Sequence, residues 1–191
     1  MIGAAAGMRY RARVKLVPAA EETFRHQDYA RRPPIDGVAV HELKRFHDDG
    51  GSMTELSRFT GGRPDALTGF DLAQLNYSVL EPGVLKAFHV HRRQTDVWFV
   101  PPEDRVLLVL ADVRAGSATE RVVMKLVLGD GASILVRIPP GVAHGCKNIG
   151  PAPARIVYMT DVSFDPAPGS TDEGRLPWDL LGAEIWEPAK D

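Results

Sequence analysis

The sequence predicts an all-β domain of the jelly-roll type, in which two antiparallel sheets pack face to face. Three observations favour this fold. Fifteen prolines and 18 glycines divide the 191 residues into short segments, which is typical of strands and turns rather than of long helices. About eight segments between these breaks have the length and the β-branched, apolar composition of strands. Several are apolar throughout, as expected for strands buried in a sandwich.

The chain has three predicted parts. Residues 1–33 form an N-terminal extension, with its best helix candidate at 19–32 before a pair of prolines. Residues 34–166 form the jelly-roll domain, and residues 167–191 form a loop-rich tail whose two tryptophans are expected to pack on the barrel. The strands of the domain are expected at 37–46, 72–80, 83–91, 96–102, 105–114, 121–129, 133–140 and 154–164.

Composition excludes several classes of protein. A net charge of −2 argues against a nucleic-acid binder. The single cysteine, Cys146, excludes an internal disulfide and a cysteine-rich zinc site, and it suits a reducing compartment. No apolar run approaches the roughly 20 residues of a membrane helix, and the first residues lack a signal-peptide core of adequate length. The sequence therefore predicts a cytoplasmic protein with no membrane partner.

Two histidines lie on one predicted strand. Side chains alternate along a strand, so His89 and His91 point to the same side, opposite to Phe88 and Val90. His144 follows a Pro-Pro-Gly turn, where a loop residue can lean over the mouth of a barrel. All three imidazoles are therefore expected in one cavity.

The spacing of four residues matches the two metal-binding motifs of the cupin superfamily. His89, His91, Asp96 and His144 follow the pattern of His-x-His, a nearby carboxylate and a distant histidine after Pro-x-Gly. Three imidazoles and one carboxylate suit a divalent transition metal with open positions for a substrate. The same histidines can instead form a polar strand face, and Tyr158 can be a core aromatic residue with its hydroxyl at the rim. Both interpretations stay open on these residues alone.

A longer set of motifs resembles the dTDP-4-dehydrorhamnose 3,5-epimerase family, the sugar-nucleotide epimerases of the cupin superfamily. The resemblance covers roughly residues 34–186. It depends on several segments in the family's order: "DGVAVHELKRFHDDGG", "QLNYS", "GVLKAFHVH", "VLLVLADVRAGSAT", "IPPGVAHG", "IVYMTDVSFDP" and "RLPWD". The order of these segments is more specific than any one of them.

This resemblance implies a homodimer of cupin jelly-roll subunits that binds a nucleoside-diphosphate 4-keto-6-deoxysugar and uses no metal or other cofactor. It implies that His89 is the catalytic base and that Tyr158 returns the proton. It further implies substrate contacts from Gln74, Asn76, Glu55 and His144, with Lys86 in the place of a family arginine.

The chemistry of these residue types fits such a reaction. A proton next to a ketone is acidic because its removal gives an enolate, and imidazole has a suitable pKa for the base. Inversion needs a second acid on the opposite face of the sugar, which a tyrosine hydroxyl can provide. Donors such as Lys86 or His144, aimed at the keto oxygen, would stabilise the developing charge.

The chain also departs from the family pattern. Gly50 replaces an arginine, and Ser52 and Met53 replace two aromatic residues. The carboxylate that pairs with the base lies beyond the "IW" segment in the family, where only Asp191 is available. His91 and Asp96 are extra, so they are expected either to orient His89 or to bind a metal. Three hypotheses follow: a metal-free epimerase, a metal-dependent cupin acting on another small molecule, and a non-catalytic sugar-binding cupin.

Overall fold

The computed structural model describes residues 14–26, 34–167 and 169–188, and the chain divides into two compact units, Met1–Arg31 and Arg32–Asp191. In the first unit, α1 (Pro18–Thr23) begins at a proline, whose fixed φ suits a first helical position. Phe24 is already extended, so the helix predicted over 19–32 is shorter than expected. The rest of that prediction falls on residues 27–33, which lie outside the described residues.

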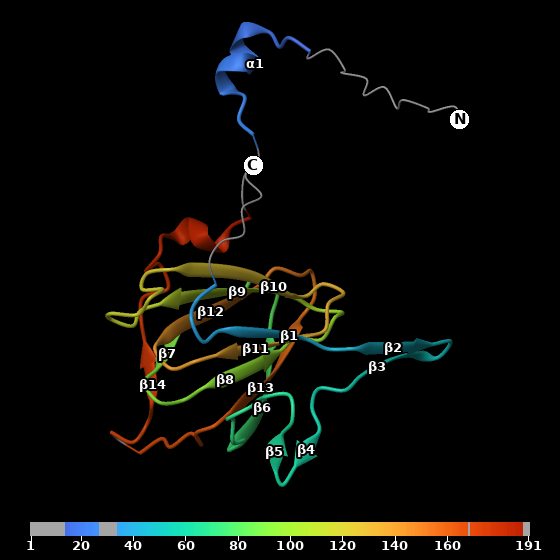
Figure 1. Ribbon diagram of the computed structural model, residues 1–191, viewed down its shortest axis with the longest axis vertical. Helices are drawn as coiled ribbons and strands as arrows, with labels where there is room; N and C mark the ends of the chain where they lie inside the picture. Colours follow the sequence, from blue (N-terminus) through green and yellow to red (C-terminus); the bar gives the residue numbers. More distant parts are fainter. Residues whose placement is uncertain (1–13, 27–33, 168, 189–191) are drawn as a thin grey trace, which may run out of the picture. The chain divides into compact units, whose positions relative to one another are not determined.

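Two five-stranded antiparallel sheets form the second unit (Figure 1). One sheet has the strand order β1, β11, β8, β13, β6, and the other has the order β10, β9, β12, β7, β14. The prediction of an all-β fold with two antiparallel sheets is confirmed. The strands are β1 (Ala39–Glu42), β2 (Arg45–Asp48), β3 (Gly51–Thr54), β4 (Phe59–Thr60), β5 (Arg63–Pro64), β6 (Gln74–Leu80), β7 (Leu85–His91), β8 (Asp96–Phe99), β9 (Arg105–Asp112), β10 (Val123–Gly129), β11 (Ile134–Ile138), β12 (Val142–Asn148), β13 (Ala154–Thr160) and β14 (Glu173–Arg175).

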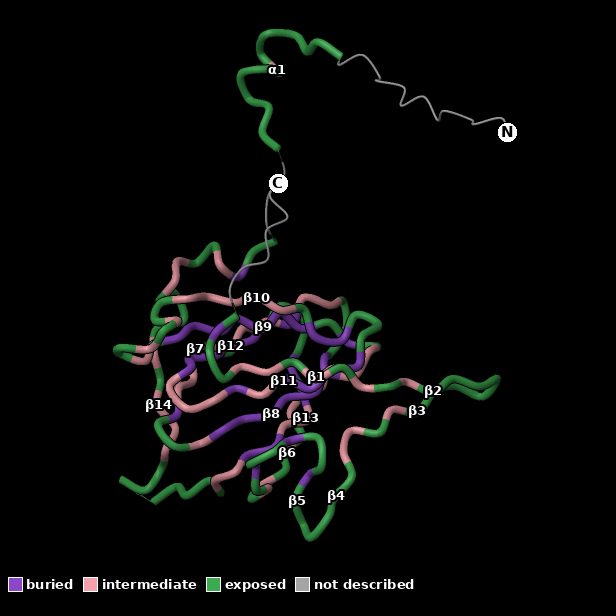
Figure 2. Tube along the Cα trace, viewed as in Figure 1, coloured by how far each residue is buried: buried purple, intermediate pink, exposed green. Residues whose placement is uncertain are grey.

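The core lies between the sheets, and further apolar clusters cover their outer faces. Figure 2 shows buried residues along the strands of both sheets. Alternate residues of β9 show why its sequence is apolar throughout. Val106, Leu108 and Leu110 belong to the central cluster. Leu107 and Val109 point to the other side, where the C-terminal segment covers them. Because both faces of β9 are buried, a polar residue is disfavoured at nearly every position of the strand.

The C-terminal segment packs on the barrel through one strand and one aromatic residue. Strand β14 pairs with β7, and a 3₁₀ helix, η1 (Ala183–Trp186), follows it. Trp186 is 2% exposed and its ring centroid lies 5.2 Å from that of Phe88. A Cβ atom at Gly145 would lie 2.8 Å from the Trp186 ring and 2.4 Å from the Ala87 Cβ, so only glycine fits beneath this tryptophan.

No helix among the described residues combines the length and the apolar character that crossing a membrane requires.

Candidate active site

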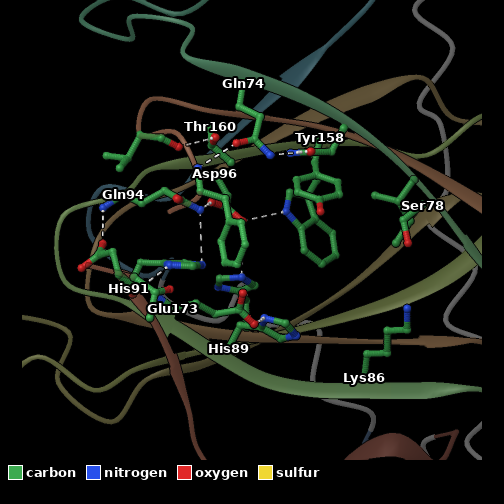
Figure 3. Close-up of a pocket in the computed structure, with 18 of the residues that line it drawn as sticks. Gln74, Ser78, Lys86, His89, His91, Gln94, Asp96, Tyr158, Thr160 and Glu173 are labelled. Carbon is green, nitrogen blue, oxygen red and sulfur yellow. Dashed lines mark hydrogen bonds and ion pairs between the residues drawn. The ribbon is translucent and has the colours of Figure 1, made fainter. Parts of the chain in front are cut away.

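A cavity of about 570 Å³ opens between the two sheets (Figure 3). Its volume lies within the range of small-molecule sites. Strands β7, β12 and β14 supply one wall, and β6, β8 and β13 supply the other. The polar and aromatic residues that line it include Gln74, Asn76, Ser78, Lys86, His89, His91, Gln94, Asp96, Trp98, His144, Tyr158, Thr160, Asp172, Glu173 and Arg175.

A β-bulge brings Lys86 and His89 to the same wall. His144 pairs with His89 and Cys146 pairs with Lys86, so two steps along β12 correspond to three steps along β7. One extra residue in a strand shifts the side-chain alternation by one position. Lys86 and His89 therefore both line the cavity although their odd spacing would otherwise place them on opposite faces. His91 follows two residues later and lines it too, as strand alternation predicts.

His89 contacts a carboxylate from the C-terminal segment. Its Nδ1 atom lies 3.1 Å from Oε1 of Glu173, and Arg175 contacts the same oxygen at 2.6 Å. The carboxylate accepts the Nδ1 proton, so the Nε2 atom carries the lone pair that can accept a proton from a substrate. Burial lowers the pKa of His89 most, His144 and Arg175 lower it further, and Glu173 opposes them, which leaves the pKa at about 4. The imidazole is thus neutral near pH 7.

Tyr158 lies on the opposite wall, on β13, beside Trp98 and Asn76 of the neighbouring strands. Figure 3 shows Tyr158 and His89 on opposite sides of the cavity. Burial raises the pKa of the Tyr158 hydroxyl, and the carboxylates of Asp96 and Glu173 raise it further. The hydroxyl therefore keeps its proton near pH 7 and is available as a donor.

Asp96 pairs with His144, and the expectation that Asp96 orients His89 is wrong. The Nε2 atom of His144 lies 3.5 Å from Oδ2 of Asp96. Gln94 donates to Oδ1 of Asp96 at 2.7 Å, and the Trp98 indole donates to Oδ2 at 3.2 Å. Burial raises the pKa of Asp96, but His144 and Gln94 outweigh it and hold the pKa at about 2. The carboxylate that contacts His89 is Glu173 instead.

The structure also corrects the setting of His144. It lies within strand β12, paired with His89 on one side and Leu110 on the other, rather than on a loop at the barrel mouth. It is 2% exposed, and its ring stacks beside those of His89 and His91 at centroid distances of 5.8 and 5.5 Å.

His91, Asp96 and His144 form a group that could hold a metal ion, since their ligand atoms all lie within 4.8 Å of one another. The metal-site hypothesis included His89 as a fourth ligand. That residue is not part of the group, and its Nδ1 atom contacts Glu173.

Most of the expected substrate-contacting residues line the cavity, and one does not. Gln74, Asn76 and Lys86 line it, and the Gln74 amide donates to Asn76 Oδ1 at 2.7 Å. Glu55 instead forms an exposed ion pair with Arg58 at 2.8 Å and borders a separate surface depression. Within one chain, Glu55 is therefore not brought to the cavity.

The contribution of the C-terminal segment to the site was not predicted from the sequence. Asp191, the residue considered there for the paired carboxylate, lies outside the described residues, and Glu173 contacts His89. The available signal was the charged run Asp172 to Arg175, set in an otherwise proline- and glycine-rich tail. A solvated loop would show the same run, so the pattern was not specific.

Comparison with known proteins gives a consistent picture. The family model described as dTDP-4-dehydrorhamnose 3,5-epimerase matches residues 32–179. The spore coat polysaccharide biosynthesis protein SpsL of Bacillus subtilis is 39% identical over 145 residues, covering 76% of this chain and 91% of that protein. The probable low-salt glycan biosynthesis epimerase Agl13 of Haloferax volcanii is 30% identical over 148 residues, covering 77% of this chain and 90% of that protein.

A solved structure agrees with these matches. The dTDP-6-deoxy-D-glucose-3,5-epimerase RmlC of Legionella pneumophila, in complex with dTDP-4-keto-L-rhamnose, has a TM-score of 0.68 and 25% identity, covering 83% of each chain. The two-sheet fold and the length of the family match therefore agree. The chain belongs to the dTDP-4-dehydrorhamnose 3,5-epimerase family, whose members are isomerases with the cupin fold.

Proposed function

We propose that this protein epimerises a dTDP-linked 4-keto-6-deoxyhexose by removing a proton from a carbon next to the ketone. The observation that carries the proposal is the position of two groups. A neutral imidazole backed by a carboxylate, His89 with Glu173, faces a protonated phenol, Tyr158, across one cavity. An inversion needs this arrangement, since the base and the acid must act on opposite faces of the same carbon.

The proposed reaction balances with protein groups alone. His89 Nε2 takes the proton, the C–H electron pair enters the enolate, and Glu173 stabilises the resulting imidazolium. The enolate then takes the Tyr158 proton on its other face and regains the ketone. The proton on His89 leaves and the Tyr158 phenolate regains one through solvent in the cavity. The ammonium group of Lys86, on the His89 wall, can stabilise the enolate oxygen. No cofactor takes part in these steps.

The substrate class is supported by the relatives. The Legionella protein was solved with dTDP-4-keto-L-rhamnose bound, and the name of the Haloferax relative places it in glycan biosynthesis. Conversion of nucleotide sugars is a metabolic reaction of small soluble substrates, and the free thiol of Cys146 suits a reducing compartment. We therefore propose a cytoplasmic location.

The function is tested by incubating the protein with dTDP-4-keto-6-deoxyglucose and following the product by NMR. Inverted coupling constants next to the ketone are the expected result. The control substrate is dTDP-glucose, which lacks the ketone and should stay unchanged because its C–H bonds are not acidic. Binding of both sugars with conversion of neither would favour a sugar-binding protein without catalysis.

Glu173 is expected to act through His89 as a positioning residue. Glu173→Gln should lower kcat by about 10²-fold, because the amide can no longer stabilise the imidazolium. Glu173 raises the pKa of His89, so its neutralisation should lower that pKa. The acidic limb of the kcat/KM profile, expected near pH 4 in the wild-type protein, should then move to lower pH.

The matched control is Glu184→Gln, the same change at an exposed residue of the same C-terminal segment. It should leave both kcat and the pH profile unchanged. Glu173→Asp should recover part of the lost rate. A Glu173→Gln profile that keeps its acidic limb would show that the carboxylate has no influence on the base.

We also propose that the protein is a homodimer that pairs through β6. This strand is at the edge of its sheet, and its outward side chains Leu75, Tyr77 and Val79 are 63%, 64% and 46% exposed. A row of apolar side chains on an edge strand is a site for association. Light scattering should give twice the chain mass, and Tyr77→Lys should shift it to the monomer. A wild-type monomer at micromolar concentration would remove the proposal.

A further inference from the structure

His91, Asp96 and His144 form a buried group that the proposed epimerisation does not use. They come from β7, β8 and β12, so both sheets contribute to the group. Their exposed fractions are 7%, 4% and 2%. All three ligand atoms lie within 4.8 Å of one another. Buried charges in proteins are usually paired or coordinate a metal ion, and the Asp96 carboxylate is such a buried charge.

The hydrogen bonds of the two imidazoles fix their orientation. The Nδ1 atom of His91 lies 3.2 Å from the carbonyl oxygen of Asp172. The Nδ1 atom of His144 lies 3.2 Å from the carbonyl oxygen of Val142. A carbonyl oxygen only accepts, so each Nδ1 carries a proton, and Nε2 is the nitrogen of each ring that can bind a metal ion. Metal-binding histidines in proteins are commonly held in this way.

Both Nε2 atoms face the Asp96 carboxylate or its neighbours. That of His144 lies 3.5 Å from Oδ2, and that of His91 shares the Gln94 amide with Oδ1, at 3.4 and 2.7 Å. No lysine or arginine among the described residues forms an ion pair with Asp96. Two imidazole Nε2 atoms and a carboxylate are thus directed at one small volume, and a metal ion there would replace any proton that Nε2 of His144 shares with Asp96.

We propose that His91, Asp96 and His144 bind a divalent transition-metal ion, with His89 left outside the coordination sphere. Two imidazoles and one carboxylate, with open positions, suit zinc, iron(II) or cobalt(II). Bond lengths of about 2.0–2.2 Å require small movements of the three side chains and rotation of the Gln94 amide. The ion would link the two sheets behind the base. This inference is independent of the epimerase proposal, in which no step passes through a metal.

Cobalt(II) is the probe, because its visible absorption reports nitrogen and oxygen ligation directly. Wild-type protein without a His tag, treated with a chelator and dialysed, should bind one Co²⁺ per chain with a new visible band. Excess Zn²⁺ should remove the band and raise the thermal midpoint of the protein, since a ligand that binds only the folded state stabilises it. Absence of any band at equimolar Co²⁺ would overturn the proposal.

Variants identify the ligands. Asp96→Asn, and independently His91→Ala if the first does not fold, should weaken Co²⁺ binding at least about 100-fold. His89→Gln should bind Co²⁺ like the wild type, because His89 is not part of the group whose ligand atoms lie within 4.8 Å of one another. His47→Ala, at an exposed position of β2, controls for binding to surface histidines. A band that persists in both Asp96→Asn and His91→Ala, or that disappears in His47→Ala, would contradict this ligand set.

Discussion

His89→Ala is expected to lower the rate of solvent-deuterium incorporation next to the ketone by about 10² to 10⁴, the usual contribution of a general base. The reason is geometric. Two other described histidines line the cavity. The Nε2 atom of His144 faces Asp96, and the Nε2 atom of His91 faces the Gln94 amide. Only His89 is backed by Glu173 and has Nε2 available for a substrate proton. The rate is measured by NMR in D₂O with a dTDP-4-keto-6-deoxysugar.

The control for this substitution is His47→Ala, which removes an exposed imidazole from β2 and should leave exchange unchanged. Binding of the nucleotide sugar to His89→Ala, measured by calorimetry, should stay within a few fold of the wild type, which separates catalysis from binding. If His89→Ala kept its exchange rate and His144→Ala lost it, the base would be His144.

Tyr158→Phe is expected to separate exchange from inversion. Proton removal by His89 does not need the phenol, so deuterium should still enter from the His89 side. Delivery to the opposite face does need it, and inversion should therefore fall by about 10²-fold or more. One NMR experiment measures both rates, because deuterium content and stereochemistry appear in the same spectrum.

The matched control for this variant is Tyr77→Phe, which makes the same change on the outward face of β6, away from the cavity. It should alter neither rate. Equal losses of exchange and inversion in Tyr158→Phe would show that Tyr158 assists the first proton transfer, and that another group returns the proton.

The two-sheet fold could be predicted because most of its strands are apolar segments between prolines and glycines. Strand β12 was not predicted, and the reason is physical. Its sequence, Val142 to Asn148, mixes apolar, polar and charged residues with a glycine, yet nearly all of it is buried between β9 and β7. Three of its residues have tertiary contacts that explain them. His144 lines the cavity, Gly145 packs beneath Trp186, and the Asn148 amide donates to the Leu80 carbonyl oxygen. A sequence pattern carries no record of such contacts.

The site could be predicted in part. Strand alternation was sufficient for His89 and His91, which lie two residues apart on one strand. The shared wall of Lys86 and His89 depends on a bulge that nothing in "LKAFH" reveals. Glu173 lies on a strand of three residues, too short for any periodicity. Asp96 and its partner His144 lie on different sheets. Their contact depends on how the sheets pack together, which the sequence pattern does not show.

Solvent-deuterium incorporation by chelator-treated wild-type protein tests the central claim most directly. With a dTDP-4-keto-6-deoxysugar in D₂O, the proposal predicts one deuterium at an epimerised carbon next to the ketone, in the absence of added metal, at a rate that His89→Ala reduces. Absence of deuterium from every dTDP-4-keto-6-deoxysugar tested, or incorporation that appears only when a metal is restored, would contradict it.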